Sequence, residues 1–392
     1  MIGCTKLLCG TATVSDIVKY GRSTQNLPPH MLQFSSDARP LVVWNTTNRC
    51  NLSCQHCYIN AADIDYSGEL TTSEAKTFID DLAEIKAPVL LFSGGEPLLR
   101  PDILELGAYA KSLGVRPVLS TNGTLITLDA AQQIKAAGFE YVGVSLDGDE
   151  EVHDKFRGKK GAFAETIAGI RNSLKAGNKT GVRFTINKLN YHTLPNVLAI
   201  VEQEGIPRFC MYHLVYAGRG RGMSDLDTTA EQKTATINLL IGQVLDWQKR
   251  GINTEILTTD NHADGIHILK YFEKHGPERV PEIKELLKMH GGCSAGEKMA
   301  NVDPQGNVHP CQFWGHKTLG NVKAKKFSEI WLKPEGASGF LADLRQKPQL
   351  VQGKCGACTY KDYCSGCRIR AEAIHQDLWG EDPACYLADT QK

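Results

Sequence analysis

Residues 40 to about 215 alternate short β-favouring runs with amphipathic stretches of helical period. The apolar runs are 41–45, 88–93, 116–120, 141–146, 182–187 and 209–215. Regular alternation of this kind favours parallel strands joined by right-handed helical crossovers. Six strand–helix units are too few to close an eightfold barrel. We therefore expect an α/β fold, an open and partial (β/α)6 barrel of the TIM type, with active residues after the carboxyl ends of its strands.

Three of the connecting helices carry boundary signals. Thr71 begins a capping box and predicts the start of one helix. Pro101 is predicted to occupy the first position of a second helix, which should end near Gly114. A third helix is expected from about 162 to 176, before Gly177.

The character of the chain changes near residue 290. A long helical stretch at about 229–250 is followed by less regular sequence, and from Cys293 the chain is rich in cysteines and turns. A hairpin is expected at Pro304-Gln305-Gly306. The predicted division is a lead-in at 1–39, the partial barrel at 40–235, a helical bridge at 236–290 and a small cysteine-rich α+β domain at 291–392.

Charge and apolar content restrict the possible partners. Lys plus Arg and Asp plus Glu both number 44, so no global charge draws the protein to nucleic acid or to an anionic membrane. The start of the chain has too short an apolar run for a secretory signal, and no run reaches membrane-spanning length. We expect a cytoplasmic protein. Disulfides are rare in that compartment, so its 13 cysteines are candidate metal ligands, catalytic thiols or buried apolar residues.

Three cysteines stand within eight residues, shortly after the first apolar run. Cys50, Cys54 and Cys57 have the spacing C-x3-C-x2-C. Thiolates are soft ligands that suit iron–sulfur clusters or zinc. Structural zinc takes four protein ligands, and no fourth Cys or His stands at a suitable spacing, because His56 lies inside the loop. The pattern favours a 4Fe–4S cluster that leaves one iron free to bind another molecule, with a zinc site as the alternative.

Motifs after the later apolar runs extend this pattern. The chain has "SGGEP" at 93–97, "STNG" at 120–123, "SLDG" at 145–148 and "HDKFRG" at 153–158. Together with the cysteine triplet, this order resembles the radical S-adenosylmethionine (SAM) enzymes. The resemblance implies that the three cysteines hold a catalytic cluster whose open iron binds SAM. It also implies that one electron from the cluster cleaves SAM to a 5′-deoxyadenosyl radical.

By the same resemblance, residues near the strand ends bind SAM. Gly94 and Gly95 would allow a close backbone approach, and Glu96 would face the SAM ammonium group. Ser145 would contact the ribose and Arg157 the carboxylate. The full predicted set is Tyr58, Gly94, Gly95, Glu96, Asn122, Ser145, Arg157 and Leu214, in which Tyr58 and Leu214 would flank the adenine.

The C-terminal cysteines resemble the SPASM extension of this family, which carries two auxiliary iron–sulfur clusters, expected here as 4Fe–4S. The resemblance implies a distal cluster on Cys355, Cys358, Cys364 and Cys385, and a proximal cluster on Cys293, Cys311 and Cys367. Seven cysteines are one short of eight. A proximal iron is therefore open, or it is held by a non-cysteine ligand, Cys4 or Cys9. A zinc ribbon is the alternative, although its five-residue spacer is short, and Cys210 in an apolar strand is expected in the core.

The likeness over nearly the whole chain is to the radical SAM enzymes of the siroheme-dependent route to heme. It is carried by "MIGCTKLLCGT", "LPPHMLQFSSDARPLVVWNTTNRCNLSCQHCY" and "MYHLVYAGRGRG". It implies that 12,18-didecarboxysiroheme, an iron tetrapyrrole, loses acetate side chains to give Fe-coproporphyrin III. Coproheme decarboxylation, side-chain removal in dioxo-heme biosynthesis and peptide maturation stay as alternatives. Reduced flavodoxin or ferredoxin is the expected electron donor.

Two observations bear on the substrate. Sulfatase maturases have a catalytic aspartate where this chain has Gln312, which cannot take up a proton, and this weakens the peptide alternative. The carboxylates of a tetrapyrrole require cationic or hydrogen-bonding partners. The predicted substrate-binding residues are His213, Tyr216, Arg219 and Arg221, on a loop whose alternative role is a solvated basic surface. Possible iron ligands or ring contacts are His309, His316, Trp314 and Tyr212. An electron-transfer protein without SAM chemistry and a zinc-stabilised binding module stay open as other classes.

Overall fold

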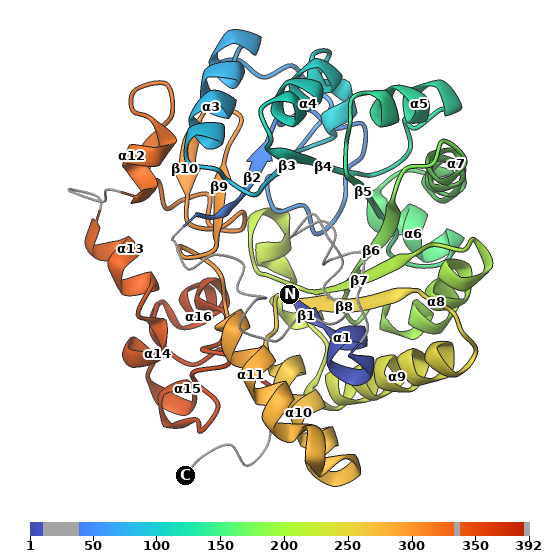
Figure 1. Ribbon diagram of the computed structural model, residues 1–392, viewed down its shortest axis with the longest axis vertical. Coiled ribbons are helices and arrows are strands. Elements are labelled where there is room, and N and C mark those ends of the chain that lie inside the picture. Colours follow the sequence, from blue (N-terminus) through green and yellow to red (C-terminus); the bar gives the residue numbers. More distant parts are fainter. Residues whose placement is uncertain (11–38, 333–337, 388–392) are drawn as a thin grey trace.

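A curved, mostly parallel β-sheet dominates the computed structural model of the protein, which describes residues 1–10, 39–332 and 338–387. Its strand order is β1-β8-β7-β6-β5-β4-β3-β2-β9-β10-β11. The sheet curves around an interior without closing, and helices surround it (Figure 1). The strands are β1 Ile2–Gly3, β2 Leu41–Asn45, β3 Val89–Ser93, β4 Arg116–Thr121, β5 Tyr141–Ser145, β6 Thr180–Ile186, β7 Arg208–His213, β8 Glu255–Thr259, β9 Met299–Val302, β10 Asn307–His309 and β11 Gly320–Asn321. The partial barrel expected from the alternating sequence is confirmed.

Strands β2 to β7 coincide with the predicted runs to within two residues. They pair in parallel with sequential neighbours. Their residues alternate between two environments, as the period of a strand requires. Val42, Trp44 and Phe92 are at most 1% exposed and pack beneath the helices, whereas Leu41 and Val43 line the interior.

A seventh parallel strand, β8, extends the barrel beyond the six predicted units. It lies inside the region predicted as a helical bridge. Its sequence begins with Glu255 and ends in two threonines, so it lacks an apolar pattern. The structure makes this buried glutamate tolerable, because it forms an ion pair with Arg208 of β7 at 3.4 Å.

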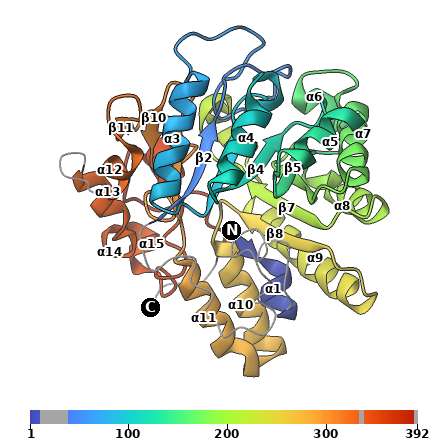
Figure 2. The ribbon, with the colours of Figure 1, turned by 45° about the horizontal axis from the view of Figure 1, so that its top comes forward.

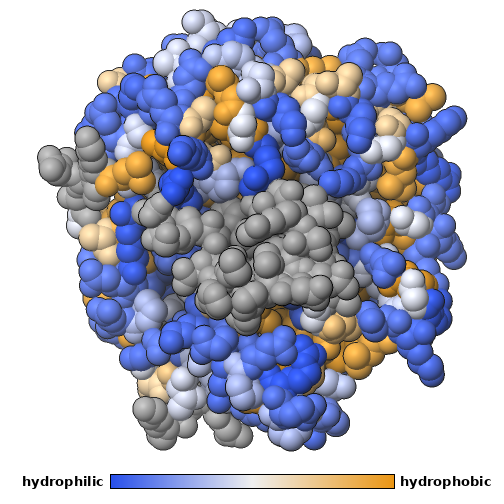
Figure 3. Space-filling view, in the orientation of Figure 1, coloured by the Kyte–Doolittle hydropathy of each residue, from blue (hydrophilic) through white to orange (hydrophobic). Residues whose placement is uncertain are grey.

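Helices cover the outer face of the sheet (Figure 2). The helices of the described residues are α1 Cys4–Cys9, α3 Thr72–Glu84, α4 Ile103–Ser112, α5 Leu128–Ala136, α6 Glu150–Arg157, α7 Ala162–Lys175, α8 Leu194–Gln203, α9 Ala230–Lys249, α10 Ala263–His275, α11 Val280–His290, α12 Phe327–Leu332, α13 Ser338–Leu344, α14 Lys347–Leu350, α15 Gly353–Ala357 and α16 Arg368–His375, with 3₁₀ turns at Pro97–Leu99, Tyr191–Thr193, Gly218–Leu226 and Pro277–Arg279. Helices α13 to α16 lie beside the barrel in the C-terminal region (Figure 1). The visible outer face of the molecule is largely hydrophilic, with hydrophobic residues scattered among polar ones (Figure 3). No helix among the described residues is long and apolar enough to cross a membrane.

Two of the three predicted helix boundaries are confirmed. Thr71 caps α3 with both hydrogen bonds of a capping box, and Gly177 follows α7 with φ 76°. The Pro101 prediction is wrong, because α4 begins at Ile103. The carboxylate of Asp102 accepts hydrogen bonds from Arg100 and Thr72, which holds the chain in a turn ahead of the helix.

The N-terminal and C-terminal segments both join the sheet. Ile2 and Gly3 form an antiparallel pair with β8, while most of the predicted lead-in, 11–38, lies outside the described residues. Strand β9 pairs in parallel with β2, and the predicted hairpin at Pro304 links it to β10. The cysteine-rich region therefore shares the barrel sheet. The domain division at residues 235 and 290 stays a prediction.

Candidate active site

A cavity of about 250 Å³ occupies the interior of the barrel. Inward-facing residues of the strands line it, from Leu41 and Val89 at one end to the loop of the cysteine triplet at the other. Of the predicted SAM-binding set, Tyr58, Gly94, Gly95, Asn122, Ser145, Arg157 and Leu214 line this cavity. Residues that follow different strands thus meet in one place, as expected for the carboxyl ends of a barrel.

The cysteine triplet lies on a loop that is fixed by backbone contacts. The amide of Cys50 donates to the Ala62 carbonyl at 3.0 Å, and Ser53 N donates to Arg157 O at 3.1 Å, at the end of α6. Cys50 and Cys54 are buried, and Cys57 is partly buried. All three thiols line the cavity.

The triplet thiols have N–H groups aimed at them. Arg157 Nη1 lies 3.4 Å from Cys54 Sγ, and the amide of Ala61 lies 3.4 Å from Cys57 Sγ. Such donors stabilise thiolate ligands of iron–sulfur clusters. His56 is stacked on Phe156 with ring centroids 4.5 Å apart, and burial lowers its pKa to about 4. Within the described chain, no three His, Cys, Asp or Glu side chains form a group that could hold a single metal ion.

The two glycines of "SGGEP" pack against the segment before the triplet. A Cβ on Gly94 would lie 2.5 Å from the Thr47 carbonyl oxygen, and one on Gly95 would overlap the Arg49 carbonyl. Gly94 also has φ 130°, which favours glycine. The glycines therefore permit close packing between the loop after β3 and the cysteine loop.

Glu96 connects the loop after β3 to the end of β4 through hydrogen bonds. It is fully buried, and its carboxylate accepts hydrogen bonds from Leu98 N, Thr121 Oγ1 and Asn122 N at 2.8–3.1 Å. Burial raises its pKa to about 7, against these hydrogen bonds. Glu96 does not line the cavity, and its contacts fix the strand ends of β3 and β4 instead. Its contact with SAM stays a prediction.

Arg157 connects the loop after β5 to the cysteine loop. It forms an ion pair with Asp147 and reaches Cys54 Sγ, while its buried Nε has no hydrogen-bond partner among the described residues. Burial would raise the pKa of Asp147, but the guanidinium beside it holds the pKa below its ordinary value. An oriented cation with an unused donor therefore lies at the cavity wall.

The remaining predicted SAM contacts differ in how they are held. Tyr58 Oη donates to Asn45 Oδ1 at 2.8 Å, and its ring lies edge-on to Phe313. Asn122 Nδ2 donates to Asn51 Oδ1 at 2.8 Å, beside Cys50. Ser145 ends β5, and Leu214 follows β7. These placements bring the set to one rim, and the individual SAM contacts stay predictions.

The C-terminal cysteines fall into two spatial groups. Cys355, Cys358, Cys364 and Cys385 line one small cavity, whereas Cys293, Cys311 and Cys367 belong to one buried cluster with Val215. This is the division that the resemblance implied. Backbone amides of Tyr360, Gly366 and Asp382 each point at a thiol of the first group at 3.4 Å. Thiols with N–H donors again match the requirements of cluster ligands.

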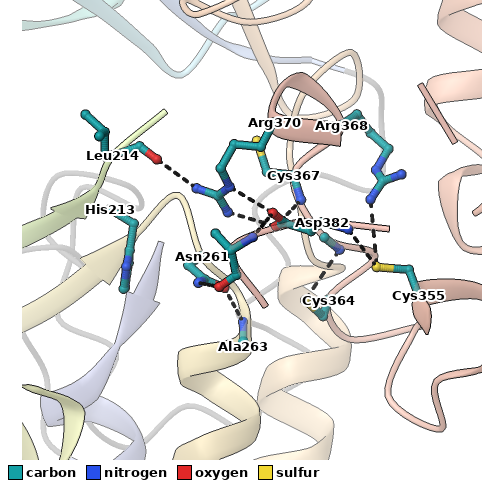
Figure 4. Close-up of polar contacts among 12 residues, drawn as sticks. His213, Leu214, Asn261, Ala263, Cys355, Cys364, Cys367, Arg368, Arg370 and Asp382 are labelled. Atoms are coloured by element: carbon teal, nitrogen blue, oxygen red, sulfur yellow. Dashed lines mark hydrogen bonds and ion pairs between the residues drawn. The ribbon is translucent and has the colours of Figure 1, made fainter. Parts of the chain in front are cut away.

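A buried arginine links these two groups to the barrel (Figure 4). Arg370 forms two hydrogen bonds to Asp382 at 2.8 and 2.9 Å and a third to the Leu214 carbonyl at 3.1 Å. Asp382 in turn accepts from Cys367 N at 2.7 Å, and its own amide points at Cys355. One ion pair therefore contacts both cysteine groups and the strand end that bears Leu214.

Cys4, Cys9 and Cys210 lie apart from these groups. Cys4 is buried, and its thiol lies 3.9 Å from the Ile2 carbonyl, while burial raises its pKa. Cys9 ends α1. Cys210 is 3% exposed and lines the barrel interior. The prediction that it is a buried strand residue is confirmed.

Comparison with known proteins gives matches along the whole chain. The model of the Radical SAM superfamily matches residues 44–201, and that of the SPASM iron–sulfur cluster-binding domain matches residues 293–368. The chain is 47% identical over 391 residues to the Fe-coproporphyrin III synthase of Methanosarcina barkeri, covering 99% of this chain and 98% of the relative. The chain belongs to the radical SAM superfamily. It is also 42% identical to the pre-heme d1 synthase of Dinoroseobacter shibae, covering 89% and 86% of the two chains.

A solved structure shares the fold. The structure of Streptococcus suis SuiB bound to S-adenosylmethionine aligns with a TM-score of 0.69 at 18% identity, covering 89% of this chain and 78% of that one. As a radical SAM enzyme with a SPASM region, the protein uses SAM, a 4Fe–4S cluster and auxiliary iron–sulfur clusters. The donor sets fit these cofactors, because three thiols meet at the SAM-side cavity and seven more form the two C-terminal groups.

The predicted substrate loop is used largely for structure in this radical SAM enzyme. Arg219 donates to the carbonyls of Cys54 and Ala61 at 2.8 and 2.9 Å, so it braces the cysteine loop. His213 Nε2 lies 2.8 Å from Asp264 of α10. Tyr216 Oη donates to Asp227 at 2.9 Å. These three side chains have protein partners, and their contact with substrate stays a prediction.

Arg221 lies at a second, outer cavity of about 550 Å³. This cavity shares Tyr58, Gln312 and Phe313 with the inner one, and His309 and His316 also line it. Both nitrogens of His309 have partners, Lys317 O and Asp303 Oδ2, and His316 Nε2 contacts Glu372. Trp314 is fully buried and donates to Glu372 at 2.6 Å, while Tyr212 lines the inner cavity.

Sequence reasoning missed the polar side chains inside the barrel. Arg183 of β6 and Arg208 of β7 line the inner cavity, together with Asp260, which follows β8 with φ 68°. The signal was present in "VRFTIN", where an arginine interrupts an otherwise apolar strand. In a parallel strand covered on both faces, such a residue points into the barrel and demands a partner.

Proposed function

We propose that this radical SAM enzyme acts on an iron tetrapyrrole and removes acetate side chains from 12,18-didecarboxysiroheme to give Fe-coproporphyrin III. The observation that carries the proposal is the 47% identity, over 99% of the chain, to a protein named Fe-coproporphyrin III synthase. The relative named pre-heme d1 synthase supports the same class of substrate.

The two-sided interior of the barrel supports a flat, partly apolar substrate. Strands β2 to β4 present mainly aliphatic side chains to the cavity, with Ser93, Ser120 and Thr121 at their carboxyl ends, and strands β5 to β7 present mainly polar ones. The aliphatic wall is made by Leu41, Val43, Val89, Leu91 and Val118, and the polar wall by Tyr141, Arg183, Thr185, Arg208 and Tyr212. A tetrapyrrole has apolar faces and a rim of carboxylates, so its chemistry matches both walls.

Gln312 supports a tetrapyrrole over a peptide. It follows Cys311 and lines both cavities, at the position where the maturases resembled by this chain have a catalytic aspartate. An amide cannot take up a proton at neutral pH. Deprotonation of a peptide side chain by this residue is therefore excluded.

The residues of the chain divide the work as follows. Cys50, Cys54 and Cys57 would hold the SAM-cleaving cluster, and Arg157, Ser145 and Leu214 would orient SAM beside it. SAM and this cluster, when bound, supply a carbon radical able to remove hydrogen from an unactivated C–H bond. The buried walls of the cavity would exclude water and other hydrogen donors from that radical.

The two C-terminal cysteine groups would hold the auxiliary clusters, which supply one-electron chemistry when bound. The Cys293, Cys311 and Cys367 group packs with Val215, which lines the inner cavity, so it is the group beside the site. A reduced flavodoxin or ferredoxin in the cytoplasm is the electron donor we propose. No nucleic acid or membrane partner enters the proposal, since the formal net charge is +0.

One anaerobic reaction tests the proposed function. The reconstituted enzyme is incubated with SAM, a strong reductant and iron 12,18-didecarboxysiroheme, and products are identified by mass spectrometry. Loss of two acetate side chains with matching 5′-deoxyadenosine is the expected result. Deoxyadenosine with an unchanged ring would refute the substrate while retaining the radical SAM chemistry.

The same assay separates the related activities. Decarboxylation of coproheme, or removal of side chains from a dioxo-heme precursor, would assign the enzyme to the neighbouring tetrapyrrole reactions. The relative named pre-heme d1 synthase makes this second candidate worth testing. Parallel reactions with each tetrapyrrole, compared by initial rate, decide among them.

A further inference from the structure

Arg183 lies on the inner face of the barrel, and its side chain extends across the neighbouring strand. It lies on β6 beside Ser145, the last residue of β5. Its guanidinium crosses β5 at Gly143, where a Cβ would clash with it, and hydrogen-bonds to Ser120 of β4. Ser120 pairs with Gly143 in the sheet, two residues before Ser145. The guanidinium therefore lies one layer deeper in the barrel than Ser145.

Arg183 lacks the carboxylate partner that Arg157 and Arg208 have. Arg157 pairs with Asp147, and Arg208 pairs with Glu255. Arg219 is held by two loop carbonyls. Within the described residues, Arg183 has the Ser120 hydroxyl as its only hydrogen-bond partner and no carboxylate at ion-pair distance. The nearby ionisable groups that interact with it are the phenols of Tyr58, Tyr141 and Tyr212 and the thiol of Cys210.

A partly buried cation without a counter-ion is unfavourable, and a bound anion removes the penalty. A guanidinium presents paired N–H donors whose geometry matches a carboxylate. The same cavity is lined by the aliphatic side chains of Leu41, Val89 and Leu91. The space beside Arg183 thus suits a carboxylate on the edge of a large apolar ligand.

We propose that Arg183 binds a carboxylate of the tetrapyrrole substrate, with Ser120 holding the guanidinium and Gly143 giving it room. This inference rests on the proposed function and adds the residue that selects an acidic substrate. The methionine carboxylate of SAM has the same chemistry, but Arg157 already lies at Cys54 beside the cluster loop. The depth of Arg183 places it with the substrate.

Binding measurements on the full-length, cluster-loaded enzyme test the inference. The probes are iron coproporphyrin III and its tetramethyl ester, which carries no charge on its side chains, and the signal is the shift of the Soret band. The wild-type enzyme should prefer the acid to the ester. Arg183→Met should weaken acid binding by about 10- to 100-fold and leave ester binding unchanged. Arg183→Lys should bind the acid with an affinity between those of wild type and Arg183→Met.

Two further variants make the test specific. Gly143→Ala should displace the guanidinium and reproduce part of the loss, while Arg171→Met removes an exposed arginine paired with Glu204 and should change nothing. SAM binding and uncoupled deoxyadenosine formation should persist in Arg183→Met, which also shows that the variant is folded. Loss of SAM binding with unchanged porphyrin binding would assign the guanidinium to SAM and overturn the inference. Failure of the wild-type enzyme to bind either porphyrin would instead refute the proposed function on which it rests.

Discussion

Arg370 and Asp382 form a buried ion pair through two hydrogen bonds of 2.8 and 2.9 Å, and neither side chain is more than 5% exposed. The pair reaches the barrel through the Leu214 carbonyl and the cysteine groups through Cys367 N and Cys355 Sγ. This ion pair thus connects both C-terminal cysteine groups to the rim of the barrel.

Removing one partner of this ion pair should destabilise the enzyme strongly. Asp382→Asn leaves Arg370 buried without its counter-charge, which costs about 3–5 kcal/mol. Anaerobic urea unfolding measures the loss, and iron per chain should fall because both auxiliary groups lose their support. The double variant Arg370→Met with Asp382→Leu should be less destabilised than Asp382→Asn alone. A single variant as stable as wild type would contradict the assigned role.

Replacing cysteines of different groups should separate SAM cleavage from turnover. Cys54→Ala should abolish deoxyadenosine formation, because it removes one of three ligands of the SAM-binding cluster. Cys358→Ala should reduce product formation much more than SAM cleavage, since its group lies apart from the inner cavity. Quantifying deoxyadenosine and tetrapyrrole product in the same reaction checks both. Retained deoxyadenosine in Cys54→Ala would refute the cluster assignment.

A methyl group on Gly95 should disturb the cysteine loop. Its Cβ would overlap the Arg49 carbonyl and lie 3.0 Å from the Asn48 carbonyl. We expect Gly95→Ala to lose most of the iron bound at the triplet and most SAM cleavage. Gly222→Ala is the matched control, because a Cβ there has nothing within 4 Å. Equal iron content in the two variants would show that the packing is unimportant.

We expect Arg219 to stabilise the cysteine loop rather than to bind substrate. Arg219→Met removes two hydrogen bonds to the carbonyls of Cys54 and Ala61, each worth about 1.5–3 kcal/mol as a charged-donor bond. The expected result is loss of iron to a chelator at least about 10-fold faster than in wild type. Arg171→Met, on the outer surface of α7, serves as control. Unchanged chelation with weakened porphyrin binding would instead restore the substrate role predicted from the sequence.

His153 should make the fold sensitive to mild acid. The ring is fully buried, its Nδ1 accepts from the Asp147 amide at 3.1 Å, and burial with the nearby Arg157 lowers its pKa to about 4. Between pH 6.5 and 4 the unfolded chain binds a proton that the folded chain does not. Stability is therefore lost as the pH falls through that window, by about 3 kcal/mol in full.

The control for this pH effect is His153→Gln, which retains an acceptor for the amide. The difference in unfolding free energy between wild type and this variant is measured at pH 7 and at pH 4.5. Wild type should lose more stability than the variant when the pH is lowered, since only wild type has the buried imidazole. A difference that does not change with pH would contradict the argument.

Much of the fold could be predicted because the parallel strands are buried on both faces. Runs such as 41–45 and 141–146 are mostly apolar, and their positions agree with β2 and β5. Strand β8 escaped prediction because its glutamate and threonines depend on partners from other strands, Arg208 among them. A polar residue becomes compatible with a strand only through tertiary contacts, which local sequence does not contain.

The candidate site could be predicted at the level of chain position but not of side-chain direction. The family resemblance implied the grouping of Cys355 with Cys385 and the place of Gly94 near the triplet. It could not reveal that Glu96 faces Thr121 and Asn122, or that Arg219 faces the loop carbonyls. Arg183 was overlooked because it stands inside an apolar run, yet that position is what directs it into the barrel.

Because β2 pairs in parallel with β9, the hydrogen bonding of β2 is completed only late in synthesis of the chain. Val42 is made early, but one of its two neighbouring strands supplies Ala300, which leaves the ribosome long after the rest of the barrel. Until then the edge of β2 has unpaired amides and carbonyls, and such edges recruit other chains. The cysteine triplet follows this same strand, so the strand that leads into the triplet gains its second neighbour only when the segment that leads to Cys311 is in place. A nascent chain that ends before residue 299 would therefore leave this edge of β2 exposed.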